Sequence, residues 1–501
     1  MVAPARSRSA AARTTLTRLL PLLLSLLALA GPAQAPERPN VVVLMTDDQT
    51  YADMAAMPRT RRLIGEAGAR FTRSYVSYPL CCPSRATYLT GQYNHNNGVH
   101  TNAPPNGGVE ALDAEHTLPV WLSQAGYRTS HIGKYLNGYG LRRKANVPPG
   151  WTDWHGTIDK STYQMYGYRM YENGAVNRYG DFDVEDPAMY QTDVLRQKAI
   201  ASIEGTAPGT PLFLSLMFVA PHGESVDPGS TTEPFIRAAP RDVGRYRRLR
   251  LPRAARGERD VSDKPPYVRK LHGASSATAA RIRADFRSRR ESLIAVDEAV
   301  EALVGALART GRLDSTYILF TSDNGFFQGE HNIYKGKYLA YDPSSHVPLL
   351  IRGPGIRPGT VSGELVTNAD LAPTILEAAG ATADRSLDGR SLLPFARDGR
   401  LRTRRPVLHE GLEAGDIDRD GAVRSGTVGE YHALRTARYL YVEWINGARE
   451  LYDRARDPGE LHSRHRDRRY RGIRRSLHRE LVRLRSCAGD VCRQPMGPLG
   501  G

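Results

Sequence analysis

The sequence predicts a three-layer α/β sandwich with a large mixed central sheet, followed by a smaller C-terminal α+β domain. Continuous apolar runs of strand length alternate with segments whose apolar residues recur at helical spacing. A run that is apolar throughout is typical of a strand covered on both faces. At 501 residues the chain is long enough to bury one large core and a smaller one.

Four apolar runs predict strands of the central sheet, and two periodic segments predict helices that cover it. The strands are expected at residues 41–45, 212–219, 317–320 and 347–351. The apolar residues of the helices are Ile294, Val296, Val300, Leu303 and Leu307 in one, and Leu371, Ile375, Leu376 and Ala379 in the other. Residues 228–270 are rich in Pro, Gly and Arg without a clear period, so we expect a long surface excursion there.

A linker is expected near residues 399–405, which places the α/β domain at 38–398 and the C-terminal domain at 406–495. Within the second domain, residues 439–444 and 450–453 resemble strands. A basic helix follows, with one apolar stripe made of Ile473, Leu477, Leu481 and Leu484. Such a stripe can touch a membrane or pack on a small sheet, and packing on a sheet is the commoner case.

The N-terminus resembles a secretory signal over residues 1–30. Four arginines precede a leucine-rich run at 19–30, which is too short for a spanning helix. Ala28 and Ala30 give the small-x-small pattern that favours cleavage after Ala30, whereas Pro36 disfavours cleavage after Ala35. No other stretch is apolar enough to cross a bilayer, so we expect an exported protein without stable membrane insertion.

Cys487 and Cys492 enclose a short loop near the C-terminus. In an oxidising compartment this pair is expected to form a local disulfide, the alternative being two free structural thiols.

The formal net charge of +16 comes mostly from arginine. It favours an anionic substrate or surface, although a genomic bias toward arginine gives the same composition. No basic cluster accompanies a nucleic-acid-binding motif, so the charge does not indicate nucleic acid as a partner.

Polar residues follow three of the predicted strands. Asp47 and Asp48 follow the first strand, His222 the second, and Asp323 and Asn324 the third. Open α/β sheets bind ligands beyond the carboxyl ends of their strands, so these side chains are expected to converge. Three carboxylates and an amide suit a hard divalent cation, Ca²⁺ first and Mg²⁺ second. An isolated Asp-Asp pair is otherwise more often a helix cap or a turn.

Residues 81–91 carry the most informative motif, Cys-Cys-Pro-Ser-Arg-Ala-Thr-Tyr-Leu-Thr-Gly. Adjacent cysteines can form a vicinal disulfide, two buried thiols or half of a metal site. Metal-binding cysteine motifs usually space their ligands as C-x2-C and repeat them, which this chain does not do. A cysteine protease has no use for Pro83, Arg85 and the Leu-Thr-Gly tail.

This motif resembles the signature of the formylglycine-dependent sulfatases. In that family a formylglycine-generating enzyme oxidises the first cysteine of C-x-P-S-R to an aldehyde, which here implies Cys81, with Cys82 at the variable place. A hydrated aldehyde has two geminal hydroxyls, one to attack sulfur and one to lose its proton later and expel sulfate. A plain Ser or Cys nucleophile would be left with a stable ester to hydrolyse.

The resemblance extends over nearly the whole mature chain and identifies it as similar to the type I sulfatases of the alkaline phosphatase superfamily. Further matching segments are Gly133-Lys134-Tyr135, Ala220-Pro221-His222, Gly336-Lys337, Arg352-Gly353-Pro354-Gly355, Glu450-Leu451-Tyr452-Asp453 and Asp457-Pro458.

The resemblance implies a role for each site residue. The implied metal ligands are Asp47, Asp48, Asp323, Asn324 and an oxygen of the modified Cys81. Arg85 would hold the formylglycine hydrate. Lys134, His222 and Lys337 would bind sulfate, with Lys337 or His222 protonating the leaving oxygen.

One departure concerns the segment after Lys134. Many sulfatases have G-K-W-H there, and the histidine assists sulfate release, whereas this chain has Gly-Lys-Tyr-Leu-Asn at 133–137. The same Gly-Lys-Tyr-Leu-Asn motif occurs in the subgroup that resembles N-acetylglucosamine-6-sulfatase and the heparan 6-O-endosulfatases. Asn137 and His95 are the candidates for the missing contact.

The sequence therefore predicts an exported enzyme that hydrolyses O-sulfate monoesters, with sulfated glycans of the glucosamine 6-sulfate type as substrates. Alternatives are a broad arylsulfatase, a phosphonate or phosphate ester hydrolase of the same superfamily, and an inactive protein that binds sulfated glycans. Specificity is expected to lie in loops such as 98–108 and 159–183.

Overall fold

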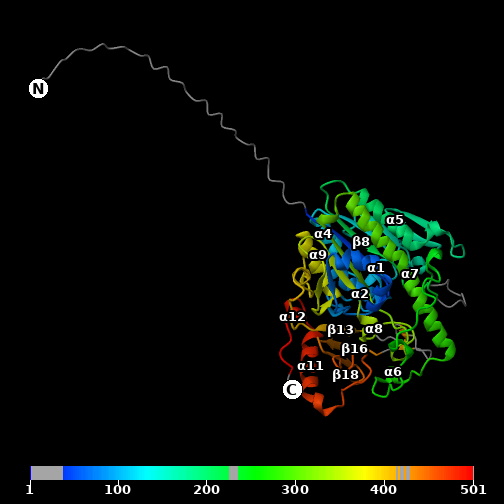
Figure 1. The fold of residues 1–501 in the computed structure, drawn as a ribbon, viewed down its shortest axis with the longest axis vertical. Coiled ribbons are helices and arrows are strands. Elements are labelled where there is room, and N and C mark those ends of the chain that lie inside the picture. Colours follow the sequence, from blue (N-terminus) through cyan, green and yellow to red (C-terminus); the bar gives the residue numbers. More distant parts are fainter. Residues whose placement is uncertain (2–37, 225–234, 413–415, 418–422, 425–428, 500–501) are drawn as a thin grey trace, which may run out of the picture. The chain divides into compact units, whose positions relative to one another are not determined.

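A ten-stranded mixed sheet forms the centre of the α/β part, as predicted from the apolar runs (Figure 1). The computed structural model describes residues 1, 38–224, 235–412, 416–417, 423–424 and 429–499. Except for Met1, the predicted signal segment at 1–30 lies outside these residues, so it stays a prediction.

The sheet combines five central parallel strands with mixed edges. Its strands are β1 (Asn40–Thr46), β2 (Ala69–Phe71), β4 (Arg128–Gly133), β5 (Asp153–Thr157), β6 (Tyr168–Glu172), β7 (Ala175–Tyr179), β8 (Leu212–Met217), β9 (Thr316–Ser322), β10 (Leu349–Arg352) and β11 (Thr360–Ser362). Their order is β11-β2-β10-β9-β1-β8-β4-β5-β6-β7. The strands from β9 to β5 are parallel, while β10, β6 and β7 pair with their neighbours in antiparallel fashion.

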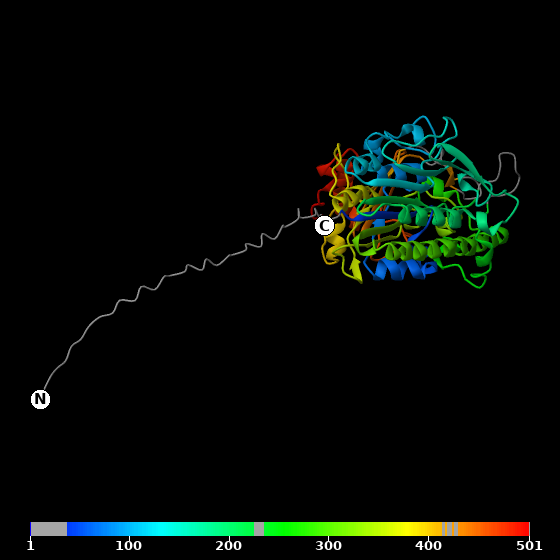
Figure 2. The ribbon, with the colours of Figure 1, turned by 90° about the horizontal axis from the view of Figure 1, so that it is seen from above.

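Helices cover both faces of this sheet, which gives the predicted three layers (Figure 2). One face is covered by α2 (Cys81–Thr90), α4 (Leu118–Gln124), α9 (Leu371–Ala379) and α10 (Leu393–Arg397). The other is covered by α5 (Gln191–Glu204) and α7 (Ser276–Arg309). Alternate residues of β1 enter the two cores, because side chains of a strand point to opposite faces. Val41 and Val43 lie in the first core and Val42 and Leu44 in the second.

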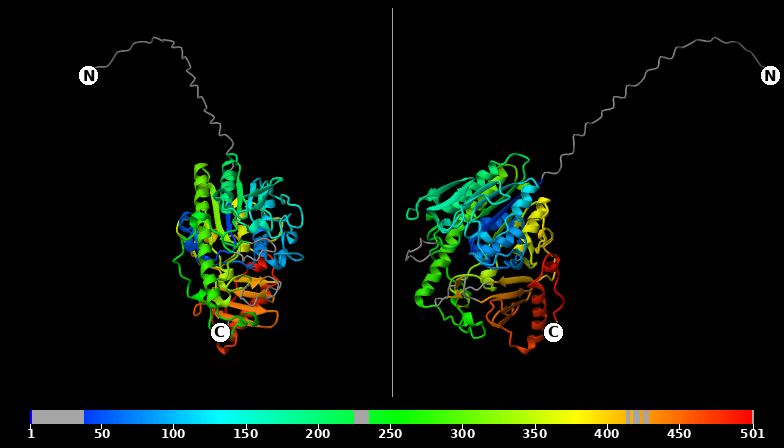
Figure 3. Two further views of the ribbon diagram at one scale, coloured as in Figure 1. Left: turned by 90° about the vertical axis from the view of Figure 1, so that its right-hand side faces the viewer. Right: turned by 180° about the vertical axis from the view of Figure 1, so that it is seen from behind.

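A four-stranded antiparallel sheet carries the C-terminal part, in the order β13 (Val407–Gly411), β16 (Tyr431–Arg435), β17 (Tyr439–Trp444), β18 (Arg449–Asp453). Both predicted C-terminal strands are confirmed. Helix α11 (Arg471–Leu484) packs on one face of this sheet, as Figure 3 shows in red beside orange strands. Leu477, Leu481 and Leu484 are buried against Leu434 and Tyr441, so the apolar stripe faces protein.

The remaining strands and helices are short. They are β3 (Ser74–Tyr75), β12 (Val366–Thr367), β14 (Asp416–Ile417), β15 (Val423–Arg424), α1 (Pro58–Thr60), α3 (Asn94–Asn97), α6 (Pro266–Arg269), α8 (Asp342–Ser345) and α12 (Asp490–Arg493). Among the residues described, no helix combines the length and the apolar character that crossing a bilayer requires.

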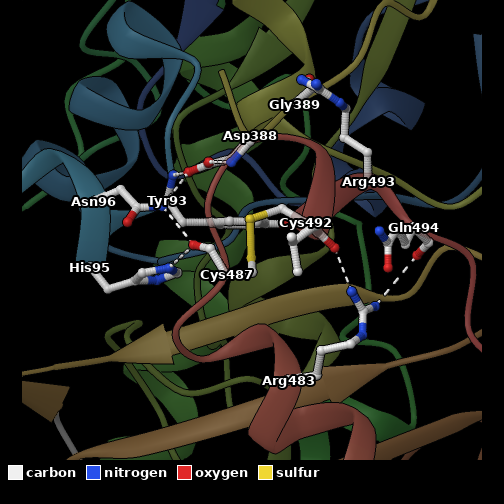
Figure 4. Close-up of a disulfide and its surroundings, with 12 residues drawn as sticks. Tyr93, His95, Asn96, Asp388, Gly389, Arg483, Cys487, Cys492, Arg493 and Gln494 are labelled. Atoms are coloured by element: carbon white, nitrogen blue, oxygen red, sulfur yellow. Dashed lines mark hydrogen bonds between the residues drawn. A yellow bond between two sulfur atoms is a disulfide. The ribbon is translucent and has the colours of Figure 1, made fainter. Parts of the chain in front are cut away.

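The predicted disulfide between Cys487 and Cys492 is present, with an S–S distance of 2.02 Å (Figure 4). The backbone carbonyl of Cys487 accepts hydrogen bonds from Asn96 Nδ2 and His95 Nε2, both at 2.8 Å. His95 Nδ1 lies 2.6 Å from Glu410, which raises the pKa of His95 to about 9 in spite of its burial. These contacts join the C-terminal loop to the segment after α2.

Two predicted irregular segments are more buried than the sequence suggested. Residues 228–234 of the predicted excursion lie outside the described residues. At its other end, Lys264 and Val268 are buried, and Val268 packs in an apolar cluster, so the prediction of a surface excursion is wrong there. Arg405, the last residue of the predicted linker, is fully buried because it pairs with Asp370. Composition alone does not show that a polar segment folds back onto the core.

A buried histidine in strand β4 of the central sheet makes stability depend on pH. The His131 ring stacks on Trp154 with centroids 4.5 Å apart, and neither ring nitrogen has a partner within the described part. Burial lowers the pKa of His131 to about 3, so folding favours the neutral form. Its stability contribution is present above about pH 6.5 and is lost as the pH falls toward 3.

We therefore expect His131→Phe to raise the free energy of unfolding at pH 5 by about 2 kcal/mol relative to wild type. The melting temperature at pH 5 should rise accordingly. The gain should shrink at pH 8, where the unfolded-state histidine is also neutral. His272, an exposed residue, provides the control substitution His272→Phe. Equal pH dependence of unfolding in wild type and His131→Phe would refute this assignment.

Candidate active site

The polar residues that follow three strands converge at one edge of the sheet. Asp47 and Asp48 follow β1, His222 lies beyond β8, and Asp323 and Asn324 follow β9. Strand β1 lies between β8 and β9 and is parallel to both, so the three carboxyl ends are neighbours. The structure thus brings together residues that are 275 positions apart in the sequence, such as Asp48 and Asp323.

The acidic residues form a tight buried cluster. The backbone N–H of Asp48 donates to Asp323 Oδ1 at 3.2 Å, and Asn324 Nδ2 donates to Asp48 Oδ1 at 2.5 Å. Burial opposes ionisation of Asp47, but neighbouring cations, Lys134 first, hold its pKa well below the usual range. The pKa of Asp323 is raised, first by burial and then by the negative charge of Asp47. Carboxylates crowded in this way require compensating positive charge.

Cys81 is the first residue of α2 and points at this cluster. Its Sγ lies 3.5 Å from Asp47 Oδ1 and 2.8 Å from Lys337 Nζ. Burial first, and then the charge of Asp47, raise the pKa of the Cys81 thiol to about 12. The helix ends at Gly91, whose left-handed φ of 67° suits glycine, so the Leu-Thr-Gly tail of the motif closes the helix.

The two adjacent cysteines have different surroundings. Cys82 belongs to the apolar core on the helix-covered face of the sheet, and its backbone N–H donates to Asn102 Oδ1 at 2.9 Å. Both cysteines are free thiols, so the alternative of a vicinal disulfide is not realised. Only Cys81 faces the acidic cluster.

Arg85 lies one turn after Cys81 and therefore on the same face of α2. Its Nε donates to Asp323 Oδ2 and its Nη1 to the carbonyl of Lys134, both at 2.8 Å. Although burial opposes its charge, Asp323 and Asp47 raise the pKa of Arg85. The guanidinium thus connects α2 to the acidic cluster and to the residue that follows β4.

Two lysines and a histidine lie around the acidic cluster. Lys134 Nζ contacts the Asp47 carboxylate, and Lys337 Nζ contacts the Asp48 carboxylate. The side chains of Lys134 and Lys337 are only 2% and 11% exposed. Burial opposes the charge on each, but the carboxylates outweigh it and raise both pKa values. His222 Nε2 lies 3.7 Å from Asp48, and its Nδ1 lies 2.6 Å from the Gly223 carbonyl.

The sequence reasoning missed Arg289, which supports the site from α7. Its guanidinium donates to the backbone carbonyl of Asp48 and, at 3.3 Å, to that of Pro221. It also lies 3.5 Å from Asp53. Arg289 therefore fixes the segments that carry Asp48 and His222. A signal was present, because Arg289 and Arg290 interrupt an apolar stripe at helical spacing between Phe286 and Leu293.

The residue at the histidine position of the G-K-W-H pattern is Leu136, which is buried in the apolar core. His95 lies beyond the C-terminal end of α2, with its ring nitrogens at Glu410 and Cys487, whereas Cys81 begins that helix. Asn137 instead donates to Tyr163 Oη at 2.7 Å. Of Asn137 and His95, the two candidates for the missing contact, only Asn137 contacts Tyr163, whose ring lies beside Lys134.

A cavity of about 340 Å³ opens onto the cluster. Asp48, His222 and Lys337 are among the residues that line it. Residues of α7 and of the 326–338 segment form its walls. A cavity of this size holds a small-molecule group or one residue of a chain. The site can therefore hold an anionic group between the lysines and the acidic cluster, provided that a cation neutralises the carboxylates of that cluster.

Family comparisons agree with this geometry. A model described as Sulfatase matches residues 39–381, and one described as N-sulphoglucosamine sulphohydrolase, C-terminal, matches 329–487. An arylsulfatase of Volvox carteri is 34% identical over 94% of this chain and 78% of its own length. An N-acetylglucosamine-6-sulfatase of Homo sapiens is 33% identical over 95% of this chain and 90% of its own length.

A solved structure supports the fold assignment. It contains a protein in complex with its substrate D-glucosamine-2-N,6-O-disulfate, and it superposes with a TM-score of 0.73 at 24% identity. The match covers 91% of this chain and 98% of the other. With the matching family model and these relatives, the chain belongs to the sulfatase family, whose members are sulfuric ester hydrolases.

Proposed function

We propose that this protein is an exported sulfatase that removes O-sulfate from glycans of the glucosamine 6-sulfate type. The observation that carries the proposal is the position of Cys81, which alone of the two cysteines faces a buried cluster of carboxylates and cations. The relative from Homo sapiens is named for N-acetylglucosamine 6-sulfate, and Drosophila and Caenorhabditis relatives are named as extracellular sulfatases.

We further propose that Cys81 is converted to formylglycine by a formylglycine-generating enzyme. Its hydrate supplies one hydroxyl to attack sulfur and a second whose deprotonation expels sulfate. Cys81 is 1% exposed, and every residue of α2 is buried. A modifying enzyme therefore has to act on the chain before it folds. Arg85, which donates to Asp323, would hold the modified side chain.

The residues present fit a hard divalent cation, which we propose to be Ca²⁺, with Mg²⁺ as the alternative. Ligand atoms of Asp47, Cys81 and Asp323 lie within 4.8 Å of one another, as do those of Asp47, Asp48 and His222. Asn324 Oδ1 is buried and has no hydrogen-bond partner in the described part. Asp47, Asp48, Asp323, Asn324 and the modified Cys81 would hold the ion. When bound, it would neutralise charge on the sulfate and lower the pKa of the hydrate.

Two lysines and a histidine of the protein complete sulfate binding. Lys134, Lys337 and His222 come from three different segments and meet at the acidic cluster. In a displacement with attacking and leaving oxygens in line, the donor to the leaving oxygen lies on the side opposite the nucleophile. Lys337 Nζ contacts Cys81 Sγ, whereas His222 Nε2 lies 3.7 Å from Asp48, so we assign protonation of the leaving oxygen to His222.

The substrate class is tested by sulfate release from a panel of defined saccharides. We expect 6-O-sulfated glucosamine saccharides to be hydrolysed faster than galactose sulfates. Because the net charge is +16, long chains should be more sensitive to salt than monosaccharides, with screening over about 8 Å at physiological ionic strength.

Two controls belong to this panel. Aryl sulfate and aryl phosphate, compared at equal concentration, separate a sulfatase from a phosphate or phosphonate ester hydrolase. Turnover of aryl sulfates alone would contradict the glycan assignment and leave a broad arylsulfatase. Faster turnover of the phosphate ester would contradict the proposed reaction.

A further inference from the structure

The site contains a polar aromatic side chain that none of the motifs includes. Tyr163 ends the short helix η4 (Ser161–Tyr163), which follows β5. Its ring centroid lies 4.5 Å from that of His222, with the planes tilted by 34°. Lys134 Nζ lies 4.7 Å from the centre of the same ring. One tyrosine ring therefore contacts two of the residues to which we assign sulfate binding.

Asn137, the residue next to the expected histidine position, fixes the orientation of Tyr163. Leu136 occupies that position and is buried in the apolar core, so it offers no polar group. Asn137 follows it and donates from Nδ2 to Tyr163 Oη at 2.7 Å. The segment after Lys134 thus contributes to the site through Asn137, which holds a tyrosine from another loop.

The Tyr163 hydroxyl retains a hydrogen that it can donate. A phenol is both a donor and an acceptor, and Asn137 uses the acceptor function. Within the described ranges no acceptor for the hydroxyl hydrogen is found. Burial, the largest influence, raises the pKa of Tyr163, so the hydroxyl stays protonated near neutral pH. Such a group donates to an anion and does not act as a base.

We infer that Tyr163, held by Asn137, donates a hydrogen bond to the sulfate group. The inference rests on the proposed sulfatase function of the Cys81 site. The prediction of a loop at 159–183 is wrong for most of its length, because the segment contains η4, β6 and β7. Tyr163, near its start, contacts Lys134 and His222.

The test compares Tyr163→Phe with wild type in the modified, metal-loaded enzyme. The substitution keeps the ring and its contacts and removes only the hydroxyl. A hydrogen bond to a charged group is worth about a tenfold to hundredfold change in binding. We expect kcat/KM on an aryl sulfate to fall by about that factor, and the inhibition constant of inorganic sulfate to rise by a similar factor. Asn137→Ala should also lower kcat/KM and raise the inhibition constant of sulfate, because it removes the hydrogen bond that holds Tyr163.

Tyr171→Phe in β6 is the matched control, since it removes a tyrosine hydroxyl without a contact to the site residues, and it should leave both constants unchanged. Wild-type values of both constants in Tyr163→Phe would overturn the inference. If Tyr163→Phe does not fold, Asn137→Ala decides, and unchanged sulfate inhibition there would overturn it equally. Hydrolysis by wild type that is lost in Cys81→Ala would uphold the proposed function whatever the tyrosine variants do.

Discussion

Replacement of Cys81 by alanine is expected to abolish sulfate ester hydrolysis. The residue is the only described cysteine that points at the acidic cluster, 3.5 Å from Asp47 Oδ1. Removal of the covalent nucleophile lowers kcat on the order of 10⁶-fold in other hydrolases, and we expect a loss of that order. The measurement is the initial rate of aryl sulfate hydrolysis by purified, co-modified protein.

The matched control is Cys82→Ala, one residue further along α2. Cys82 is fully buried in the apolar core, so its loss should cost about 1 kcal/mol of stability and leave turnover within a few-fold of wild type. Thermal unfolding separates a stability defect from a catalytic one. Equal loss of activity in both variants would show that the assignment of the nucleophile is wrong.

Removal of the Asp323 carboxylate is expected to abolish both cation binding and activity. Asp323 accepts from Arg85 at 2.8 Å and from the backbone N–H of Asp48 at 3.2 Å, so it joins the helix of the nucleophile to the metal-type cluster. We expect one Ca²⁺ per wild-type chain and none in Asp323→Ala. A ligand at a hundred times its Kd stabilises the folded state by about 2.7 kcal/mol, which thermal unfolding detects.

The comparison is a titration of CaCl₂ followed by melting temperature, for wild type, Asp323→Ala and the isosteric Asp323→Asn. The melting temperature of wild type should rise as CaCl₂ is added, and that of neither variant should rise. Circular dichroism at low temperature shows whether the variants remain folded. Full activity of wild type after exhaustive chelation would refute the requirement for a cation.

The sequence predicts the central fold well because the strands are covered on both faces. The run at 41–45 has no polar residue, and it forms the middle of a sheet whose two faces are both packed. A fully buried strand leaves a short continuous apolar run, and its length and its β-branched residues favour a strand over a buried helix. The predicted excursion at 228–270 fails at its C-terminal end because burial of Lys264 and Val268 depends on partners distant in sequence.

The candidate site is predictable where residues lie at strand ends or within a motif. Asp47, Asp48, Asp323 and Asn324 converge because the carboxyl ends of adjacent parallel strands meet. Arg289 and Tyr163 are different cases. Arg289 is distinguishable only as a charge within an apolar stripe, and Tyr163 ends a single-turn helix whose position depends on tertiary packing. Sequence spacing carries no information about that position.

The most direct test of the central claim is mass analysis of the peptide that contains Cys81, from protein produced with a formylglycine-generating enzyme. We predict an aldehyde at Cys81 and an unmodified thiol at Cys82. An intact thiol at Cys81 in fully active enzyme would contradict the account.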